Sequence, residues 1–472
     1  MLENVIYLSP LLILAASIFI LMFSRHDEEE QYHCFRFSRT MLVLSFILSV
    51  IFYNKPLLPE ICEGNKYTLL FECFLYVGAI AVLFLSRKWF ASMKLPAYVY
   101  CGCIFISVLG GILLISSLHL SLTVVGAVLL MLSNYILLKS TGKKRDIDVG
   151  GSVYLSATVV SVILLCLTQI ICKEIGSSLR YEDLRAVMAE QSGNPLLFGV
   201  MAAWAVVFTF LLALAPLHFW FTEILGRTIL PVFAYFMLVP IGAYLAGFIR
   251  LNVVVFAPMA TYAGLFYKAV ALISLAVGAV GACSVQNVRK IFAYASVYHL
   301  GMVLLVLQTF TLKSISMAMV YLFTYLLAMY GICTSLFGLK IKGEYLFTLN
   351  EFEGAAHKRP YVAAIMTMFI FSLLGCPPFC GFLGSFSALN YIITGRHYFI
   401  LIYALLTLVI LSYSYLQIIK AIYFAESKEN FDRADSGIYT AIMLNVLFMI
   451  LLILKPSYLT DKMVEMLESL FA

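Results

Sequence analysis

The chain has 472 residues, of which 63% are hydrophobic and only 12% are charged, and its mean hydropathy is +0.98. This composition excludes a soluble enzyme or binding domain, because soluble proteins have about twice this share of charged residues. The formal net charge of +6 is explained by basic residues in loops, which orient a membrane chain. It therefore gives no reason to expect a nucleic-acid partner.

Apolar runs that are long enough to cross a bilayer core, roughly 20 residues each, recur along the whole chain. The protein is therefore expected to be an all-α polytopic membrane protein with no soluble domain. The first run lacks a basic n-region and a cleavage site, which predicts a retained helix and not a signal peptide. About fourteen transmembrane spans are predicted, at Asn4–Phe23, Thr40–Tyr53, Leu69–Leu85, Ala97–Ser117, Leu120–Leu138, Val153–Ile171, Leu197–Ala215, Val232–Ile249, Thr261–Cys283, Ile291–Leu307, Ile315–Leu339, Tyr361–Ile393, Phe399–Phe424 and Ile438–Leu454.

Basic residues are unevenly divided between the two sets of loops that these spans define. One set holds pairs such as Arg87 and Lys88 or Arg289 and Lys290, and the opposite set holds about half as many basic residues. Because positive loops stay in the cytoplasm, both termini are expected on the outer side. The pattern fits the plasma membrane of a bacterium.

Two apolar stretches are interrupted by proline in corresponding places of the two halves. The first is LLALAPLHFWF, with Pro216, and the second is FSLLGCPPFCGF, with Pro377 and Pro378. A helix broken inside the bilayer leaves backbone groups that lipid cannot satisfy, so the break must be packed in protein or face a watery cavity. Paired interruptions of this kind are typical of the transport path of an ion-translocating protein.

No residue pattern indicates a metal site, a bound cofactor or a catalytic centre in this chain. The eleven cysteines lie mostly in apolar spans, and Cys376 and Cys380 have no partner pair at a zinc or iron–sulfur spacing. P-loop, dinucleotide-binding and catalytic-triad motifs do not occur. We expect no metal ligands and no catalytic residues here.

Three stretches resemble, in the same order, motifs of the antiporter-like membrane subunits of respiratory complex I. They are PLHFWFTEILGRTILPV at Pro216–Val232, QNVRKIFAYASVYHLGMVLL at Gln286–Leu305 and FSLLGCPPFCGFLGSF at Phe371–Phe386. The chain length, the number of spans and the sequence VPIGAYLAGFIRL at Val239–Leu251 are most similar to the N-type subunits, the bacterial counterparts of mitochondrial subunit 2.

The resemblance implies two inverted five-helix repeats, at about residues 97–250 and 261–424, each with one of the proline-broken helices. Three helices in residues 1–96 would precede them, and one helix and a tail in residues 425–472 would follow. It also implies other complex I membrane subunits as partners in the lipid bilayer. NADH, FMN, iron–sulfur clusters and quinone would be bound in those partner subunits, while protons are driven through subunits of this type.

Four positions at which the family carries a buried charge are neutral in this chain. Val128 takes the place of the glutamate of the fifth span, and Leu211, Ile241 and Ser385 take the places of three lysines. A buried Lys–Glu pair can pass a proton, whereas valine, leucine and isoleucine cannot bind one. The sequence therefore predicts that this subunit pumps protons weakly or not at all.

Four other side chains are candidates for a proton path, and each has a structural alternative. His218 follows the first break, where it could relay protons or bond carbonyls that the proline leaves free. His299 could form a hydrogen-bonded chain with its neighbours Tyr294, Ser296 and Tyr298, or be a packed histidine. Lys268 lies about two turns from the outer surface, where snorkelling is the favoured explanation. Glu223 is expected to pair with Arg227, one helical turn away.

Three hypotheses stay open from the sequence. The chain is a complex I membrane subunit, a subunit of a related membrane-bound hydrogenase or multisubunit cation/proton antiporter, or an antiporter-like scaffold without ion flux. A stand-alone solute carrier is disfavoured, because no span offers a set of charged substrate ligands. The proteins that accompany the chain would distinguish the first two hypotheses.

Overall fold

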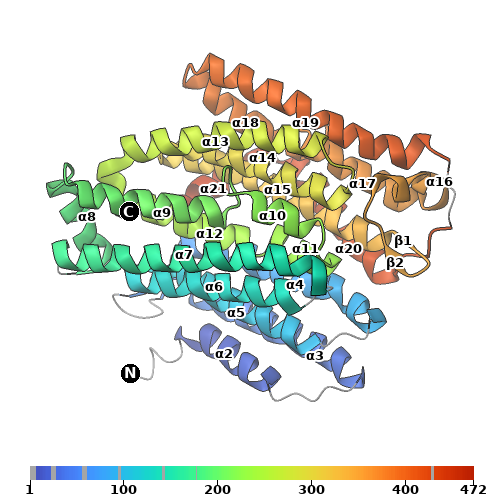
Figure 1. The fold of residues 1–472 in the computed structure, drawn as a ribbon, viewed down its shortest axis with the longest axis horizontal. Helices are drawn as coiled ribbons and strands as arrows, with labels where there is room; N and C mark the ends of the chain where they lie inside the picture. The colour runs from blue at the N-terminus through green and yellow to red at the C-terminus, as the bar shows by residue number, and fades with distance from the viewer. Residues whose placement is uncertain are drawn as a thin grey trace. The chain divides into compact units, whose positions relative to one another are not determined.

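The computed structural model describes residues 7–22, 28–55, 61–93, 97–140, 144–176, 178–426 and 430–471 (Figure 1). Residues 4–6 and 23 of the first predicted span lie outside these ranges. The chain divides into two compact units. The first comprises Met1–Leu212, Tyr235–Ala263 and Met466–Ala472, and the second comprises Ala213–Ala234 and Gly264–Glu465.

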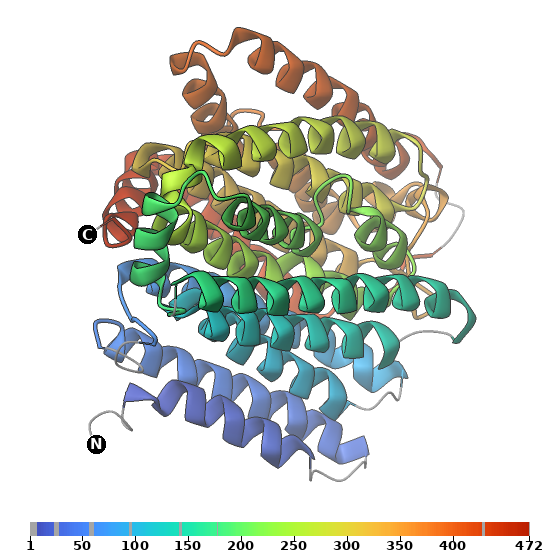
Figure 2. The same cartoon turned by 60° about the vertical axis from the view of Figure 1, so that its left-hand side comes forward.

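The first unit is a bundle of long apolar helices. Its elements are α2 (Ser9–Met22), α3 (Glu28–Phe52), α4 (Lys66–Met93), α5 (Ala97–Ser116), α6 (Leu120–Ser140), α7 (Lys144–Gly176), α8 (Tyr181–Glu190), α9 (Pro195–Leu211), α12 (Pro240–Arg250), the π-helix η1 (Leu251–Val255) and the short 3₁₀-helix η2 (Ala257–Met259). In both views α5 and α6 lie side by side, and Figure 2 shows the blue helices α2 and α3 running alongside each other.

Two glycines bring the backbones of α5 and α6 together. A Cβ added at Gly110 would lie 2.9 Å from the Gly126 carbonyl oxygen, and one added at Gly126 would lie 2.7 Å from the Gly110 carbonyl oxygen. Membrane helices pack through small residues of this kind, because close backbone contact supplies the attraction that lipid tails do not. Any larger side chain at either position would push the two helices apart.

The second unit contains the remaining helices and a small hairpin. Its elements are α10 (Phe219–Leu225), α14 (Val288–Leu307), α15 (Leu312–Gly338), β1 (Lys340–Ile341), β2 (Glu344–Tyr345), the 3₁₀-helix η3 (Leu349–Phe352), α16 (Ala355–Lys358), α17 (Pro360–Leu373), α18 (Gly381–Thr394), α19 (Tyr398–Phe424) and α20 (Ser436–Leu454). Three helices have residues in both units: α11 (Leu230–Leu238), α13 (Ala260–Cys283) and α21 (Pro456–Glu468).

The prediction of an all-α polytopic membrane protein is confirmed. Within the described ranges, eleven helices are long and apolar enough to cross a membrane, and three more apolar helices are shorter. The predicted number of transmembrane spans, fourteen, stays a prediction. Several helices are longer than their apolar runs, as when α7 extends to Gly176 beyond the predicted end at Ile171, because backbone hydrogen bonding continues into the polar residues at the membrane surface. The two-residue strands β1 and β2 pair antiparallel in a loop that hydropathy left unassigned.

Leu184 and Met188 lie on α8, in the polar interval between two predicted spans. Both side chains are buried within the first unit, and α8 packs against η1 and η2. Its apolar side therefore contacts protein.

Candidate proton-path residues and helix breaks

The first break lies between α9, which ends at Leu211, and α10, which begins at Phe219, so Pro216 stands in non-helical chain. Inside the second unit, the backbone N–H of Ala215 donates to Ser274 Oγ of α13 at 3.0 Å. Ser274 in turn donates to the Val270 carbonyl at 2.7 Å. A buried hydroxyl thus satisfies a backbone donor that the break would otherwise leave without a partner.

His218 comes two residues after Pro216 and is half-buried. Its Nδ1 atom is buried and makes no well-formed hydrogen bond to the described part of the protein. The ring lies 6.0 Å from that of Tyr294, centroid to centroid. The break therefore places a titratable ring beside an aromatic one, and whether it relays protons stays a prediction.

Glu223, on α10, is half-exposed and contacts two cations. Its Oε2 lies 2.7 Å from Lys290 Nζ and 3.5 Å from Arg227 Nη2. The i,i+4 spacing predicts the contact with Arg227, whereas Lys290 lies 67 residues away and was not expected. Gly226 makes room for the Lys290 side chain, which lies where a Cβ of residue 226 would be. Exposed ion pairs stabilise a fold by at most about 1 kcal/mol. The ion pairs of Glu223 therefore fit a modest structural role.

The second break separates α17, which ends at Leu373, from α18, which begins at Gly381, and it contains Pro377 and Pro378. The N–H of Gly381 donates to Ser372 Oγ at 3.0 Å, so a serine again satisfies a free backbone donor. Gly375 has φ of +71°, which side chains rarely adopt. The Ser385 hydroxyl lies against it, in the space that a Cβ would need.

His299, on α14, is 2% exposed and hydrogen-bonded through both ring nitrogens. Nδ1 lies 2.8 Å from the Tyr321 hydroxyl of α15, and Nε2 lies 3.1 Å from the Tyr415 hydroxyl of α19. A neutral imidazole can donate from one nitrogen and accept at the other. The arrangement is a closed Tyr–His–Tyr chain inside the second unit.

The hydrogen-bond partners that the sequence predicted for His299, namely Tyr294, Ser296 and Tyr298, are wrong. Ser296 Oγ instead donates to the Phe292 carbonyl and accepts from the Tyr325 hydroxyl. Tyr298 donates to the Ala404 carbonyl. Adjacent helical residues point about 100° apart, so Tyr298 faces another helix, and the partners of His299 come from distant parts of the sequence.

Lys268 lies on α13 and is half-buried. No hydrogen bond or ion pair of its ammonium group is found with the residues that the structure describes. Its place nine residues into α13 leaves the four-carbon stem long enough to reach the surface. Snorkelling stays the favoured interpretation.

The four neutral positions fall on four different helices. In the first unit, Leu211 at the end of α9 is 5% exposed and Ile241 on α12 is 4% exposed, while Val128 on α6 is partly exposed. In the second unit, Ser385 on α18 is partly exposed. Leu211 and Ile241 are thus surrounded by protein at sites where a lysine would need a partner.

A network of neutral polar side chains crosses the first unit, and the sequence did not reveal it. Tyr235 of α11 donates to Asn134 Oδ1 at 2.7 Å, and Asn134 Nδ2 donates to the Tyr244 hydroxyl of α12 at 3.1 Å. Tyr235 also bonds Ser107 of α5, and Ser107 lies 2.6 Å from Ser133 Oγ. We name these five residues the Asn134 network. Tyr244 lies one turn after Ile241, and Ser133 and Asn134 follow Val128 on α6.

Three charged side chains are buried among the described residues: Glu72, Arg250 and Arg289. Arg289 donates to the Thr228 carbonyl at 2.7 Å and lies 3.7 Å from the centre of the Phe347 ring. Arg250 donates to the Ile115 carbonyl at 2.8 Å and pairs with Glu63. Both arginines anchor helix ends to neighbouring backbone.

Histidines, cysteines and carboxylates do not cluster in the described ranges in a way that could hold a metal ion. The residues described above interact through hydrogen bonds between hydroxyl, amide and imidazole groups, and through the ion pairs at Glu223 and between Arg250 and Glu63.

The sequence pattern of a known family, described as "NADH:quinone oxidoreductase/Mrp antiporter, TM", matches residues 117–411. The chain belongs to this family. A curated relative from Rhodospirillum rubrum, named NADH-quinone oxidoreductase subunit N, is 26% identical over 391 residues, which cover 82% of this chain and 80% of the relative. The resemblance to antiporter-like subunits that the three motifs indicated is confirmed.

Solved structures share the family's fold. A chain of respiratory complex I from Thermus thermophilus with bound aureothin aligns with a TM-score of 0.80 at 21% identity, covering 96% of this chain and 98% of that chain. A chain of the Mrp complex from Dietzia sp. DQ12-45-1b aligns with a TM-score of 0.84 at 14% identity, covering 98% and 97%. This member of the family is thus a multi-pass membrane protein with the antiporter-like fold.

Proposed function

We propose that the chain is an N-type membrane subunit of a proton-translocating NADH-quinone oxidoreductase in the inner membrane of a bacterium. The observation that carries the proposal is the match to curated subunit N sequences over about four fifths of both chains. The three motifs support it, since they cover both helix breaks and the helix that contains His299.

In this proposal the chain does no redox chemistry and binds no cofactor. NADH, FMN, iron–sulfur clusters and quinone belong to partner subunits, and this chain contacts other membrane subunits and lipid. The proposed internal order is two inverted repeats, residues 97–250 and 261–424, preceded by residues 1–96 and followed by residues 425–472. Pro216 and Pro377–Pro378 interrupt one helix of each repeat.

We further propose that proton flux through this subunit is weak or absent. The Asn134 network supports this, because its tyrosine, serine and asparagine side chains stay neutral where a transport path needs groups that titrate. A tyrosine ordinarily releases its proton only near pH 10. Burying a lysine or carboxylate at membrane depth costs at least about 2.5–3.5 kcal/mol, so neutral residues are the more stable choice once transport is lost.

The assignment is tested by native purification of a tagged copy in mild detergent. Recovery with flavin and iron–sulfur subunits and with NADH-quinone activity is the expected result. Recovery with hydrogenase or cation-antiporter proteins would replace it by the second hypothesis, and recovery alone would leave shared ancestry without shared activity.

Proton flux is tested in the same complex after reconstitution in lipid vesicles. His299→Asn and His218→Asn are each expected to leave the ratio of protons pumped to electrons transferred unchanged. A lower ratio in either variant, with NADH oxidation unchanged, would show that this subunit carries protons through that histidine.

A further inference from the structure

Glu72 is a buried carboxyl group that neither the breaks nor the Asn134 network involves. It lies on α4, which is one of the helices long enough to span the membrane, and only 6% of it is exposed. It stands six positions after Lys66, where the helix starts, which places it about 9 Å along the axis at 1.5 Å per residue. Glu72 therefore lies within the span predicted at Leu69–Leu85.

No cation pairs with Glu72 in the described part of the first unit. The helices α2 and α5 contain no charged residue, and the charges of α3 lie in its first half, up to Arg39. The only charge of α12 is Arg250, which pairs with Glu63. Lys66 stands about 1.7 turns away, on a different side of α4.

The titratable groups beside Glu72 are phenols and thiols, which cannot carry a positive charge. Tyr53 lines the same pocket, and Tyr76 lies one turn further along α4. Cys73 is the next residue along α4, and Cys62 stands four residues before the start of this helix. Lys55, in the loop after α3, is exposed and lies over the Tyr7 ring, 5.9 Å from its centre. The charge of Glu72 is thus uncompensated whenever it is ionised.

A chain of hydroxyl groups begins beside Glu72 and joins α4 to the adjacent helices. Ser49 of α3 lines the same pocket as the Glu72 carboxyl. Ser49 Oγ lies 3.4 Å from the Tyr76 hydroxyl, which lies 2.6 Å from Ser45 Oγ, and Ser45 donates to the Pro10 carbonyl at 3.0 Å. From Ser49 onward, each hydroxyl group can donate to the next one, and the chain ends on a carbonyl acceptor.

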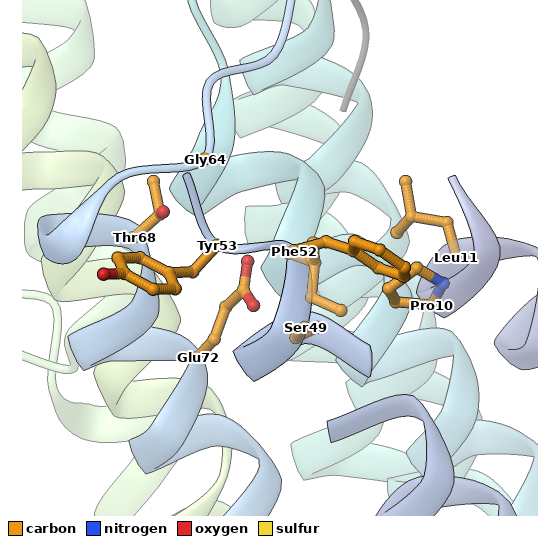
Figure 3. Close-up of a pocket in the computed structure, with 9 residues that line it drawn as sticks. Pro10, Leu11, Ser49, Phe52, Tyr53, Gly64, Thr68 and Glu72 are labelled. Atoms are coloured by element: carbon orange, nitrogen blue, oxygen red, sulfur yellow. The ribbon is translucent and has the colours of Figure 1, made fainter. Parts of the chain in front are cut away.

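A pocket leads from Glu72 toward the end of the bundle where the loop between α3 and α4 begins. Its room for water is about 10 Å³, which is about the space that one water molecule needs, and Ser49, Phe52, Tyr53, Gly64 and Thr68 help to line it. Figure 3 shows the Glu72 carboxyl group pointing into the space beside Tyr53 and Phe52. With positive loops in the cytoplasm, this end is the outer one.

These observations favour a proton as the ligand of Glu72. A carboxylate without a cation partner is unstable in a low-dielectric interior, and taking up a proton removes its charge. A metal cation would need several oxygen or nitrogen ligands, whereas the pocket offers one carboxylate and neutral hydroxyls. The pocket gives the proton a route to water.

We propose that Glu72 is a proton-binding site that exchanges its proton with the outer solution through the pocket beside Tyr53 and Thr68. On release, the carboxylic acid gives its proton to a water molecule in the pocket and becomes a carboxylate beside the polar side chains of Ser49 and Thr68. On uptake, the transfer is reversed. This inference does not depend on the complex in which the chain resides.

Dicyclohexylcarbodiimide tests the proposal, because this membrane-soluble reagent reacts with protonated carboxyl groups in apolar surroundings. The full-length chain in lipid nanodiscs is treated at a series of pH values from about 5.5 to about 9, a range in which perturbed carboxyls titrate. Adducts are located by peptide mass spectrometry. Glu63, a half-exposed carboxylate paired with Arg250, is the internal control in the same digest.

The expected result is an adduct on Glu72 that decreases as pH rises, is unchanged when sodium chloride replaces choline chloride, and is absent in Glu72→Gln. An adduct that does not vary with pH would mean a permanently protonated structural acid and would overturn the proposal. Protection by sodium at constant pH would replace the proton by a sodium ion. Absence of any adduct on Glu72 while the chain remains folded would also overturn it. If Glu72→Gln does not fold, the pH series on the wild-type chain still tests the proposal by itself.

Discussion

The Nδ1 atom of His299 lies 2.8 Å from the hydroxyl oxygen of Tyr321, although 22 residues separate them in the sequence. Because the histidine is 2% exposed, each of its hydrogen bonds replaces one that water would otherwise make. The ring is held from two helices at once, since Tyr415 bonds its other nitrogen. This geometry explains how a titratable side chain is accommodated at membrane depth without a charged partner.

Tyr321→Phe is expected to destabilise the second unit by about 1–3 kcal/mol, because it leaves a buried ring nitrogen without a partner. The measurement is thermal unfolding in detergent. Tyr298→Phe is the matched control, since the Tyr298 hydroxyl only donates to a helix carbonyl, and its loss should cost about 0.5–1.5 kcal/mol. Equal losses in the two variants would contradict a special role for the histidine contact.

Ser274→Ala is expected to cost about 1–3 kcal/mol, because the N–H of Ala215 in the first break loses its acceptor. Ser335→Ala is the control: this serine is equally buried but bonds only the Gly331 carbonyl of its own helix. Its removal should change stability much less. If unfolding temperatures fall equally, the serine does not support the break.

Glu63→Gln is expected to destabilise the first unit more than Arg250→Met does. The first change leaves a 1% exposed guanidinium without its counter-charge, whereas the second leaves a carboxylate that is 43% exposed and can be hydrated. Breaking a fully buried pair costs 3–5 kcal/mol, and the exposure of Glu63 reduces this to about 1–3 kcal/mol. Denaturation of both variants under one condition gives the order, and the reverse order would show that the arginine does not need its partner.

Acidification is expected to weaken the start of α6. The Nδ1 atom of His119 accepts a hydrogen bond from the N–H of Ser121 at 3.3 Å. Burial, and secondarily Arg180, hold the pKa of His119 below its usual value. The stabilisation by the neutral ring is therefore complete above about pH 6.5, the value for an unfolded chain, and is lost as pH falls below it.

His119→Asn is the control for this pH dependence, because asparagine is a good helix N-cap that does not titrate. The variant should equal the wild type near pH 8 and lose less stability between about pH 6.5 and about pH 5. Unfolding temperatures at several pH values provide the comparison. An unchanged pH profile in the variant would exclude His119 as the responsible group.

The helices could be predicted because hydropathy reports which segments face lipid or core, and the breaks could be predicted because proline lacks an N–H. The side-chain contacts between helices could not be predicted in this way. Tyr235 meets Asn134 across 101 residues, and His299 meets Tyr415 across 116, so no local pattern contains either pair. The sequence signal for these contacts was the presence of polar residues in apolar spans, namely a serine, an asparagine and flanking tyrosines. Lys290 was missed for the same reason, since it reaches Glu223 from another helix.

The Asn134 network also brings no formal charge on which the electrical field across the membrane could act. Moving one elementary charge through a potential of 100 mV changes the free energy by about 2.3 kcal/mol. Side chains with no formal charge contribute nothing to that term, however they rearrange. A row of lysines and glutamates would couple the packing of these helices to the membrane voltage. In this chain the helices are held by neutral hydrogen bonds among Tyr235, Asn134 and Tyr244, which add no such coupling through a formal charge.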